Sequence, residues 1–61
     1  MNKFLKARIF EKFGTQADFA KHVKVDDTLV SKVIRGRREL DKEAQKKWSR
    51  ALGVSREELF N

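Results

Sequence analysis

The sequence contains no cysteine, no proline and a single histidine. Without cysteine the chain cannot form a disulfide or a thiolate metal site, and one histidine cannot assemble a zinc centre on its own. No apolar run approaches the ~18 residues of a membrane span, and the charge at Lys3 comes too early for a signal peptide. We therefore expect no metal, no cofactor and no membrane segment, and a cytoplasmic protein that is stabilised by its core alone.

The length of the chain allows one small domain over residues 1–61. A chain of this size buries only about 60% of the surface that its unfolded state exposes. Hydrophobic and charged residues each make up 39% of the sequence, a composition that favours a folded chain over a disordered one.

Positive charge is concentrated in two segments. Fifteen Lys and Arg against nine Asp and Glu give a net charge of +6. Residues 32–50 hold eight basic and three acidic side chains, and residues 1–14 hold four and one. Such clustering indicates a polyanionic partner, and by composition alone a solvated helical face explains it equally well.

The spacing of apolar residues predicts helices and no strand. Leu5, Ile9 and Phe13 recur every four residues, as on one face of a helix. Residues suited to helix N-caps are Thr15, Asp26, Asp41 and Ser55, and residues suited to helix ends are Gly14, Gly36 and Gly53. The predicted helices cover about 3–13, a stretch that opens after Thr15, about 27–35, about 42–52, and 56–60. The sequence therefore predicts a compact all-α fold of five helices.

Residues 16–35 have the pattern of two short helices joined by a turn of about three residues. Two helices that cross over so short a turn approach closely, which explains the small side chain of Ala20. Val30 and Val33 are expected to anchor the second helix from inside. Its outer side then carries Asp27, Thr28, Ser31, Lys32 and Arg35. A polar helix held at a fixed angle is what reading a DNA major groove requires.

The segment from Thr15 to Phe60 resembles the helix-turn-helix domain of the Cro and phage-repressor group, the Xre-like family. The matching elements are Gly14-Thr15-Gln16, Ala20, Val25, Val30-Ser31-Lys32-Val33, Arg35-Gly36-Arg37-Arg38, and Ala51-Leu52-Gly53-Val54-Ser55 with Leu59. This resemblance implies a lambda-repressor-like, DNA-binding fold and a transcription regulator of the Cro type from a phage or a bacterium.

The sequence departs from the family pattern at three places. Lys24 stands where the family usually has glycine, so we expect this lysine in a left-handed conformation at a cost of about 1 kcal/mol. Ile34 replaces a commonly polar residue, and it either packs on Trp48 or faces a partner. Asp26 and Asp27 place two carboxylates at the start of the second helix, where Asp26 is expected to serve as the cap.

The resemblance also implies roles for single residues. Gln16 and the backbone amides that follow Thr15 would hold a DNA phosphate. Thr28, Ser31 and Lys32 would face base edges, and Asp27 would accept from a cytosine amine or repel other sequences. The expected backbone anchors are Arg35, Arg37 and Arg38, with Arg8 as a further candidate.

The expected partner is a double-stranded DNA operator. One recognition helix reads only a few base pairs, so a pseudo-palindromic operator and a homodimer are expected. So short a chain has little apolar surface to spare, and the dimer is expected to form on DNA and to be weak or absent in solution.

Two other classes of protein were weighed. An adaptor of the antitoxin or antirepressor type could use the same fold, and an exposed apolar patch around Phe4, Ile34 and Phe60 would favour it. An enzyme is not expected, because the sequence shows no nucleophile–base pair, phosphate loop or metal cluster. His22 has no such group near it in sequence and is assigned no function.

Overall fold

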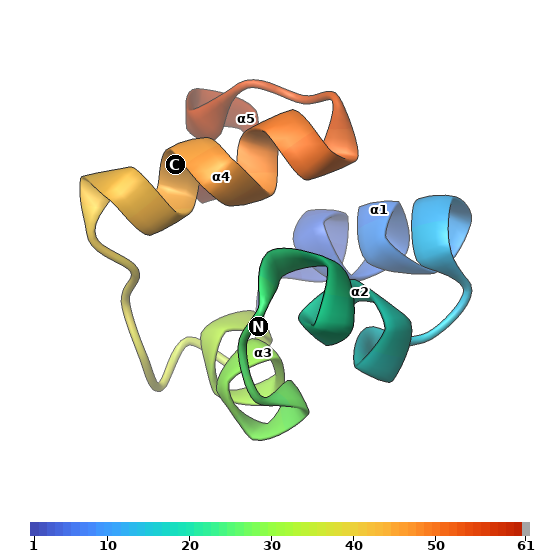
Figure 1. Cartoon of the computed structure of the whole chain (residues 1–61). Coiled ribbons are helices and arrows are strands. Elements are labelled where there is room, and N and C mark those ends of the chain that lie inside the picture. The colour runs from blue at the N-terminus through green and yellow to red at the C-terminus, as the bar shows by residue number, and fades with distance from the viewer. Residues whose placement is uncertain (61) are drawn as a thin grey trace.

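A computed structural model of the chain describes residues 1–60, and its regular structure over those residues is entirely helical (Figure 1). The helices are α1 (Lys3–Phe13), α2 (Gln16–Val23), α3 (Asp27–Ile34), α4 (Lys42–Leu52) and α5 (Arg56–Phe60). The predicted five-helix, all-α fold is confirmed. The third helix ends at Ile34, one residue before the expected end, with Arg35 as its C-cap.

The five helices enclose one apolar core. Its buried side chains are Leu5, Ile9, Phe19, Ala20, Val23, Val30, Val33, Ile34, Trp48, Leu52 and Leu59. Trp48 on α4 is 1% exposed, and its ring meets Phe19 of α2 edge-on at 5.0 Å and Phe60 of α5 at 6.2 Å. Edge-to-face pairs contribute beyond the area that they bury. Trp48 therefore joins α4 to α2, the first helix of the predicted motif, and to α5.

The backbone at Lys24 is left-handed, as the sequence predicted. Lys24 has φ 61° and ψ 46° and follows the last residue of α2. The amide of the next residue, Val25, donates to the carbonyl of Ala20 at 2.9 Å, which is the long hydrogen bond of a Schellman turn. This turn sets the direction in which the chain leaves α2 and enters α3.

Lys24→Gly is expected to leave the protein as stable or to stabilise it by up to about 1 kcal/mol. Glycine adopts positive φ without the steric cost that a lysine Cβ carries, and this gain is partly offset by the greater entropy of the unfolded chain. Thermal unfolding followed by circular dichroism measures the difference. A clear loss of stability would mean that the turn has another geometry in solution.

Asp26 is the N-cap residue of α3, as expected, but the expectation that its side chain caps the helix is wrong. Thr15 and Asp41 accept the amides of Asp18 and Ala44 at 3.0 and 2.8 Å, as side-chain caps do. Asp26 occupies the corresponding position before α3, but its side chain makes no cap hydrogen bond, and its backbone carbonyl receives the amides of the first turn instead. The start of α3 therefore carries two carboxylates, those of Asp26 and Asp27, and the Asp26 carboxylate makes no cap hydrogen bond.

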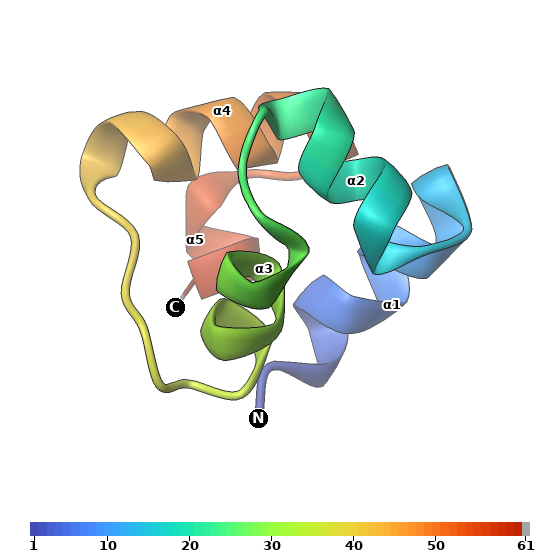
Figure 2. The same ribbon diagram turned by 60° about the horizontal axis from the view of Figure 1, so that its bottom comes forward.

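Asn2 ties the start of the chain to the end of α3 and to α5, a role that the sequence analysis missed. Its backbone amide donates to the carbonyl of Ile34 at 2.6 Å, its side-chain oxygen caps α1 by accepting from Leu5, and its side-chain amide donates to the carbonyl of Leu59. Figure 2 shows the N-terminus beside the chain that leaves α3. Asn2 thus helps to hold the end of α3 in place.

Asn2→Ala should lower the free energy of unfolding by about 1–3 kcal/mol, because it removes a helix cap and leaves the carbonyl of the buried Leu59 without its donor. Asn2→Ser is the matched control. A serine keeps the capping oxygen but is too short to reach Leu59, so it should lose less. Urea unfolding of the two variants separates the contributions, and equal losses would assign the whole effect to the Leu59 bond.

Candidate nucleic-acid interface

Helices α2 and α3 form the predicted pair, joined by Lys24, Val25 and Asp26. The two helices pack on each other, and Ala20 at their contact is 3% exposed. Val25, in the turn, is half-buried and packs against the core, so it holds the turn against the rest of the molecule. Val30 and Val33 bury the inner face of α3. The core therefore fixes the angle at which α3 is presented.

The outer face of α3 borders a shallow hollow of about 430 Å³, which we call the recognition hollow. Its lining residues are Gln16, Asp27, Thr28, Ser31, Lys32, Arg35 and Arg37. Each of these seven residues was predicted from the sequence as a DNA contact. They come from the start of α2, the length of α3 and the segment that follows it, so residues 21 positions apart meet at one surface.

Helical spacing explains why the side chains on α3 point the same way. Ser31 and Lys32 follow Thr28 by three and four residues, which places both of them beside Thr28 on one face of the helix. Thr28 and Lys32 are exposed, and Ser31, which lines the same hollow, is half-buried. A hydroxyl and an ammonium group thus lie side by side on a surface that a base edge can approach.

Gly36 brings Arg37 to the same hollow. It has φ +79°, a left-handed conformation that glycine adopts without strain, and its amide donates to the carbonyl of Val33 at 3.1 Å. The amide of Arg37 donates to the carbonyl of Lys32 at 2.9 Å. These two bonds close a Schellman turn, which folds the chain back so that Arg37 lines the hollow with Lys32.

Three of the predicted phosphate contacts lie outside the recognition hollow. The hydroxyl of Thr15 is used as the cap of α2, and its neighbour Gln16 is the residue that lines the hollow. Arg38 lines a different hollow. The guanidinium of Arg8 pairs with Glu11 at 2.9 Å and lies 5.5 Å from the ring centre of Phe4. The structure therefore does not bring Thr15, Arg38 or Arg8 together with the other seven.

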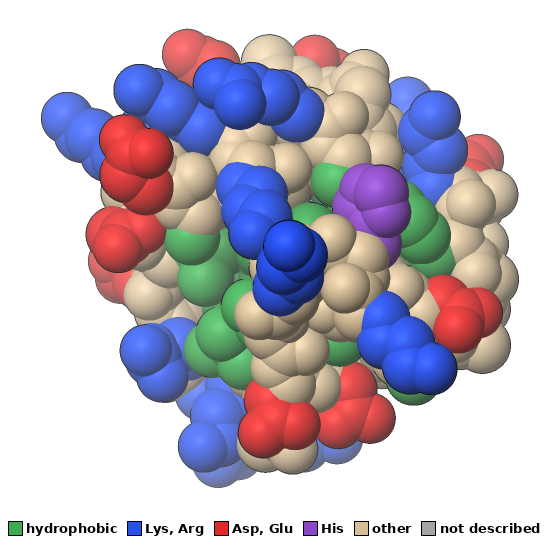
Figure 3. All heavy atoms as spheres, viewed as in Figure 1, with side chains coloured by type: hydrophobic (Ala, Val, Ile, Leu, Met, Phe, Trp, Pro, Cys, Tyr) green, Lys and Arg blue, Asp and Glu red, His purple; other side chains and the backbone are tan. Residues whose placement is uncertain are grey.

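Charge is distributed unevenly along the recognition hollow. Lys32, Arg35 and Arg37 supply three positive side chains, and Asp27 supplies one negative side chain at the start of α3. Figure 3, viewed as in Figure 1, shows acidic side chains at the lower edge, near the start of α3, and basic ones beside the loop that follows α3. Within residues 1–60, the ion pair of Arg8 and Glu11 involves none of these groups. Their charges thus remain accessible to a ligand.

The hollow offers donors for binding an anion and for reading base edges. Over the part of the chain that the structure describes, no group of three or more acidic or histidine side chains is placed to hold a metal ion. Nor does any helix within residues 1–60 have the length and apolar character needed to cross a bilayer.

This combination of a buried scaffold, a short left-handed turn and an exposed polar helix defines a helix-turn-helix DNA-binding regulator. The family model described as helix-turn-helix matches residues 6–59. The chain belongs to this family, and the resemblance to its Cro and Xre-like members is confirmed. Comparisons with curated proteins and with solved structures gave no match.

Proposed function

We propose that the protein is a sequence-specific repressor that occupies a double-stranded DNA operator through α3. The observation that carries this proposal is the recognition hollow, where every lining residue is polar or charged and three of the four charged ones are basic. A bound repressor of this kind acts by occupancy, because it excludes polymerase or a competing regulator from the same site. Such a target would place its action at the bacterial nucleoid, in the cytoplasm.

The residues of the hollow divide into readers of bases and holders of phosphate. Thr28, Ser31 and Lys32 are proposed to meet base edges, with Lys32 donating to guanine O6 or N7. Asp27 is proposed to accept from a cytosine amine at the edge of the site. Because the side chain of Asp26 makes no cap bond, its carboxylate adds to the repulsion of phosphates near the start of α3.

Phosphate contacts are proposed to flank the bases on both sides. Gln16 and the first amides of α2 lie at a helix start, where unpaired N–H groups favour an anion. Arg35 and Arg37 lie at the other end of α3 and carry the charge that neutralises the backbone. Arg38 follows Arg37 in the chain but lines the neighbouring hollow, so we propose that it neutralises a phosphate beside the recognition hollow.

We further propose that two copies bind one operator. The eight residues of α3 cover only a few base pairs, and two copies would read half-sites about 34 Å apart. Each chain measures 23 Å along its longest axis. Two copies therefore fit on successive turns of the duplex with a small area of contact between them, which explains a dimer that is weak without DNA.

Selection of bound sites from random duplex DNA tests this function directly. We expect enrichment of a pseudo-palindromic sequence, and a gel-shift titration should then show tighter binding to it than to random DNA by a factor of about 10³ or more. Recovery of no enriched sequence, with equal affinity for all duplexes, would contradict the proposal of an operator.

A further inference from the structure

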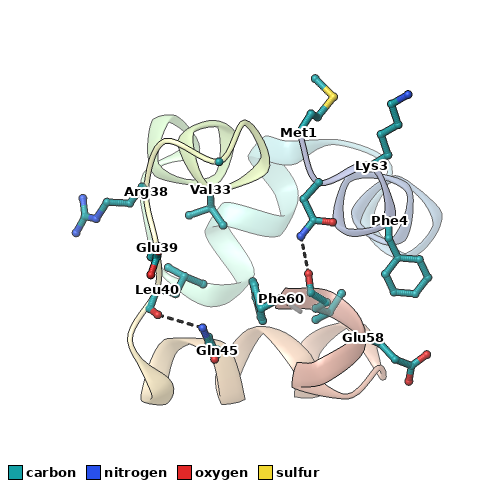
Figure 4. Close-up of a pocket in the computed structure, with 13 residues that line it drawn as sticks. Met1, Lys3, Phe4, Val33, Arg38, Glu39, Leu40, Gln45, Glu58 and Phe60 are labelled. Atoms are coloured by element: carbon teal, nitrogen blue, oxygen red, sulfur yellow. Dashed lines mark hydrogen bonds between the residues drawn. The ribbon is translucent and has the colours of Figure 1, made fainter.

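A second hollow, of about 500 Å³, lies between α1, the end of α3 and α5 (Figure 4). We call it the α1–α5 hollow. Helix α3 packs on α1 and α2 but makes no close backbone approach to α4 or α5 within the described helices, which leaves this space. Figure 4 shows Val33, Leu40 and Phe60 directed toward its middle from three different segments.

Exposed apolar side chains gather at this hollow. Met1 is 71% exposed and Phe4 is 41% exposed, and both line it. Ile34, for which the sequence left open whether it packs inside or faces a partner, is 3% exposed and belongs to the core, so it is not part of this patch. Phe4 and Phe60 do share the hollow, with Leu40 as the third apolar wall. Apolar surface of this kind marks a contact site.

The charged side chains at this hollow are balanced, unlike those of the chain as a whole. Lys3 and Arg38 stand against Glu39 and Glu58, whereas the sequence carries a net charge of +6. The rest of the molecule therefore carries the whole net charge of +6, which disfavours contact with a second copy. A two-fold contact through this hollow pairs the patch with itself, so equal numbers of cations and carboxylates allow each copy to match the charges of the other.

We propose that the α1–α5 hollow is the surface through which a second copy of this chain docks. The proposal rests on the homodimer of the proposed function and assigns it a surface. Val33 and Gly36, at the end of α3, line this hollow, while Lys32 and Arg37 line the recognition hollow. Docking here therefore sets the ends of the two recognition helices near the two-fold axis and leaves both recognition hollows open to DNA.

The size of the surface sets the strength of the contact. A stable interface buries about 800 Å² from each partner, which would be about a fifth of the 4324 Å² of this chain. One hollow and its rim supply less than that. The contact is weak between free chains, and it becomes populated when adjacent half-sites on DNA raise the effective concentration.

Titration of the free protein tests the surface without any operator. Backbone amide spectra of the full chain, recorded from about 0.05 to about 2 mM, should show shifts that depend on concentration and are confined to the α1–α5 hollow, and sedimentation equilibrium should show a weak dimer. Shifts at the recognition hollow alone, or a monomer throughout this range, would overturn the proposal and leave the α1–α5 hollow to a different protein.

Two phenylalanines on α1 provide a matched pair of variants. Phe4 and Phe10 are 41% and 42% exposed, but only Phe4 lines the hollow. Phe4→Ala should weaken the dimer by roughly ten- to fifty-fold, because each dimer loses the side chain twice, whereas Phe10→Ala should leave it unchanged. Melting curves of both variants check that the fold is kept. Equal effects of the two variants would overturn the assignment.

A second pair tests the balance of charge. Glu39→Lys changes the sum of the side-chain charges that line the hollow from zero to +2. Glu43→Lys changes the charge of the chain by the same amount, but Glu43 lies on α4, outside the hollow. Only Glu39→Lys should weaken self-association by more than threefold at low salt. Binding to DNA with one half-site should stay the same in Phe4→Ala. Failure of the unmodified protein to bind a half-site would instead contradict the proposed function. Failure of the docking proposal and failure of the proposed function are therefore distinguishable.

Discussion

Raising the salt concentration from ~50 to ~200 mM is expected to weaken operator binding about a thousandfold. Two protomers, each with Arg35, Arg37 and Arg38 at or beside the duplex, would neutralise about six phosphates. At about −0.9 per phosphate, the slope of log K against log salt is then about −5. The structure supports this expectation because two of these arginines line the recognition hollow, and neither forms part of the ion pair between Arg8 and Glu11.

Fluorescence anisotropy with a labelled duplex measures this slope. Binding in potassium glutamate and in potassium chloride, compared at equal cation concentration, controls for effects of the anion. A slope near zero would remove the electrostatic part of the account, and a slope that is the same for a variant without Arg37 would show that this residue does not touch phosphate.

Trp48→Ala is expected to leave the chain largely unfolded at 25 °C. Trp48 is 1% exposed and joins α2, α4 and α5 through its contacts with Phe19 and Phe60. Removing a buried tryptophan costs about 3–5 kcal/mol, and a core of this size rarely supplies more than about 3–5 kcal/mol in total. The loss is therefore comparable to the whole stability of the fold.

Far-UV circular dichroism and urea titration measure the effect of Trp48→Ala. Phe10→Ala is the control, since Phe10 is 42% exposed and lies outside the buried core, and it should change stability by less than about 0.5 kcal/mol. A cooperative transition for Trp48→Ala with a loss below about 1 kcal/mol would mean that Trp48 is not the centre of the core.

Much of the recognition surface could be predicted from the sequence because its determinants are local. The spacing of Thr28, Ser31 and Lys32 along one helix face follows from helical geometry alone. The left-handed backbone at Lys24 was expected from the resemblance, because the family usually has glycine at this place in the turn. Five of the seven residues of the recognition hollow were named from the helix face, and Gln16 and Arg37 were named from the family resemblance.

Features that depend on contacts distant in sequence could not be predicted in the same way. Asn2 bonds to Leu59, 57 residues away, and no local pattern encodes that partner. Its capping oxygen alone had a signal, a short polar residue before the first helix. The sequence left open whether Ile34 packs inside or faces a partner, because only tertiary packing buries it. It also does not fix whether the side chain or the backbone of Asp26 accepts the first amides of α3.

The central claim is that α3 reads bases through the recognition hollow, and Lys32→Ala tests it most directly when compared with Arg37→Ala. Both residues are exposed in the same hollow. Lys32→Ala should cost about 1–3 kcal/mol on the selected operator and much less on random DNA. Arg37→Ala should weaken binding to both DNAs equally and reduce the salt slope by about one per protomer. If Lys32→Ala weakened operator and random DNA by the same factor, Lys32 would be a phosphate contact and the claim that it reads a base would be wrong.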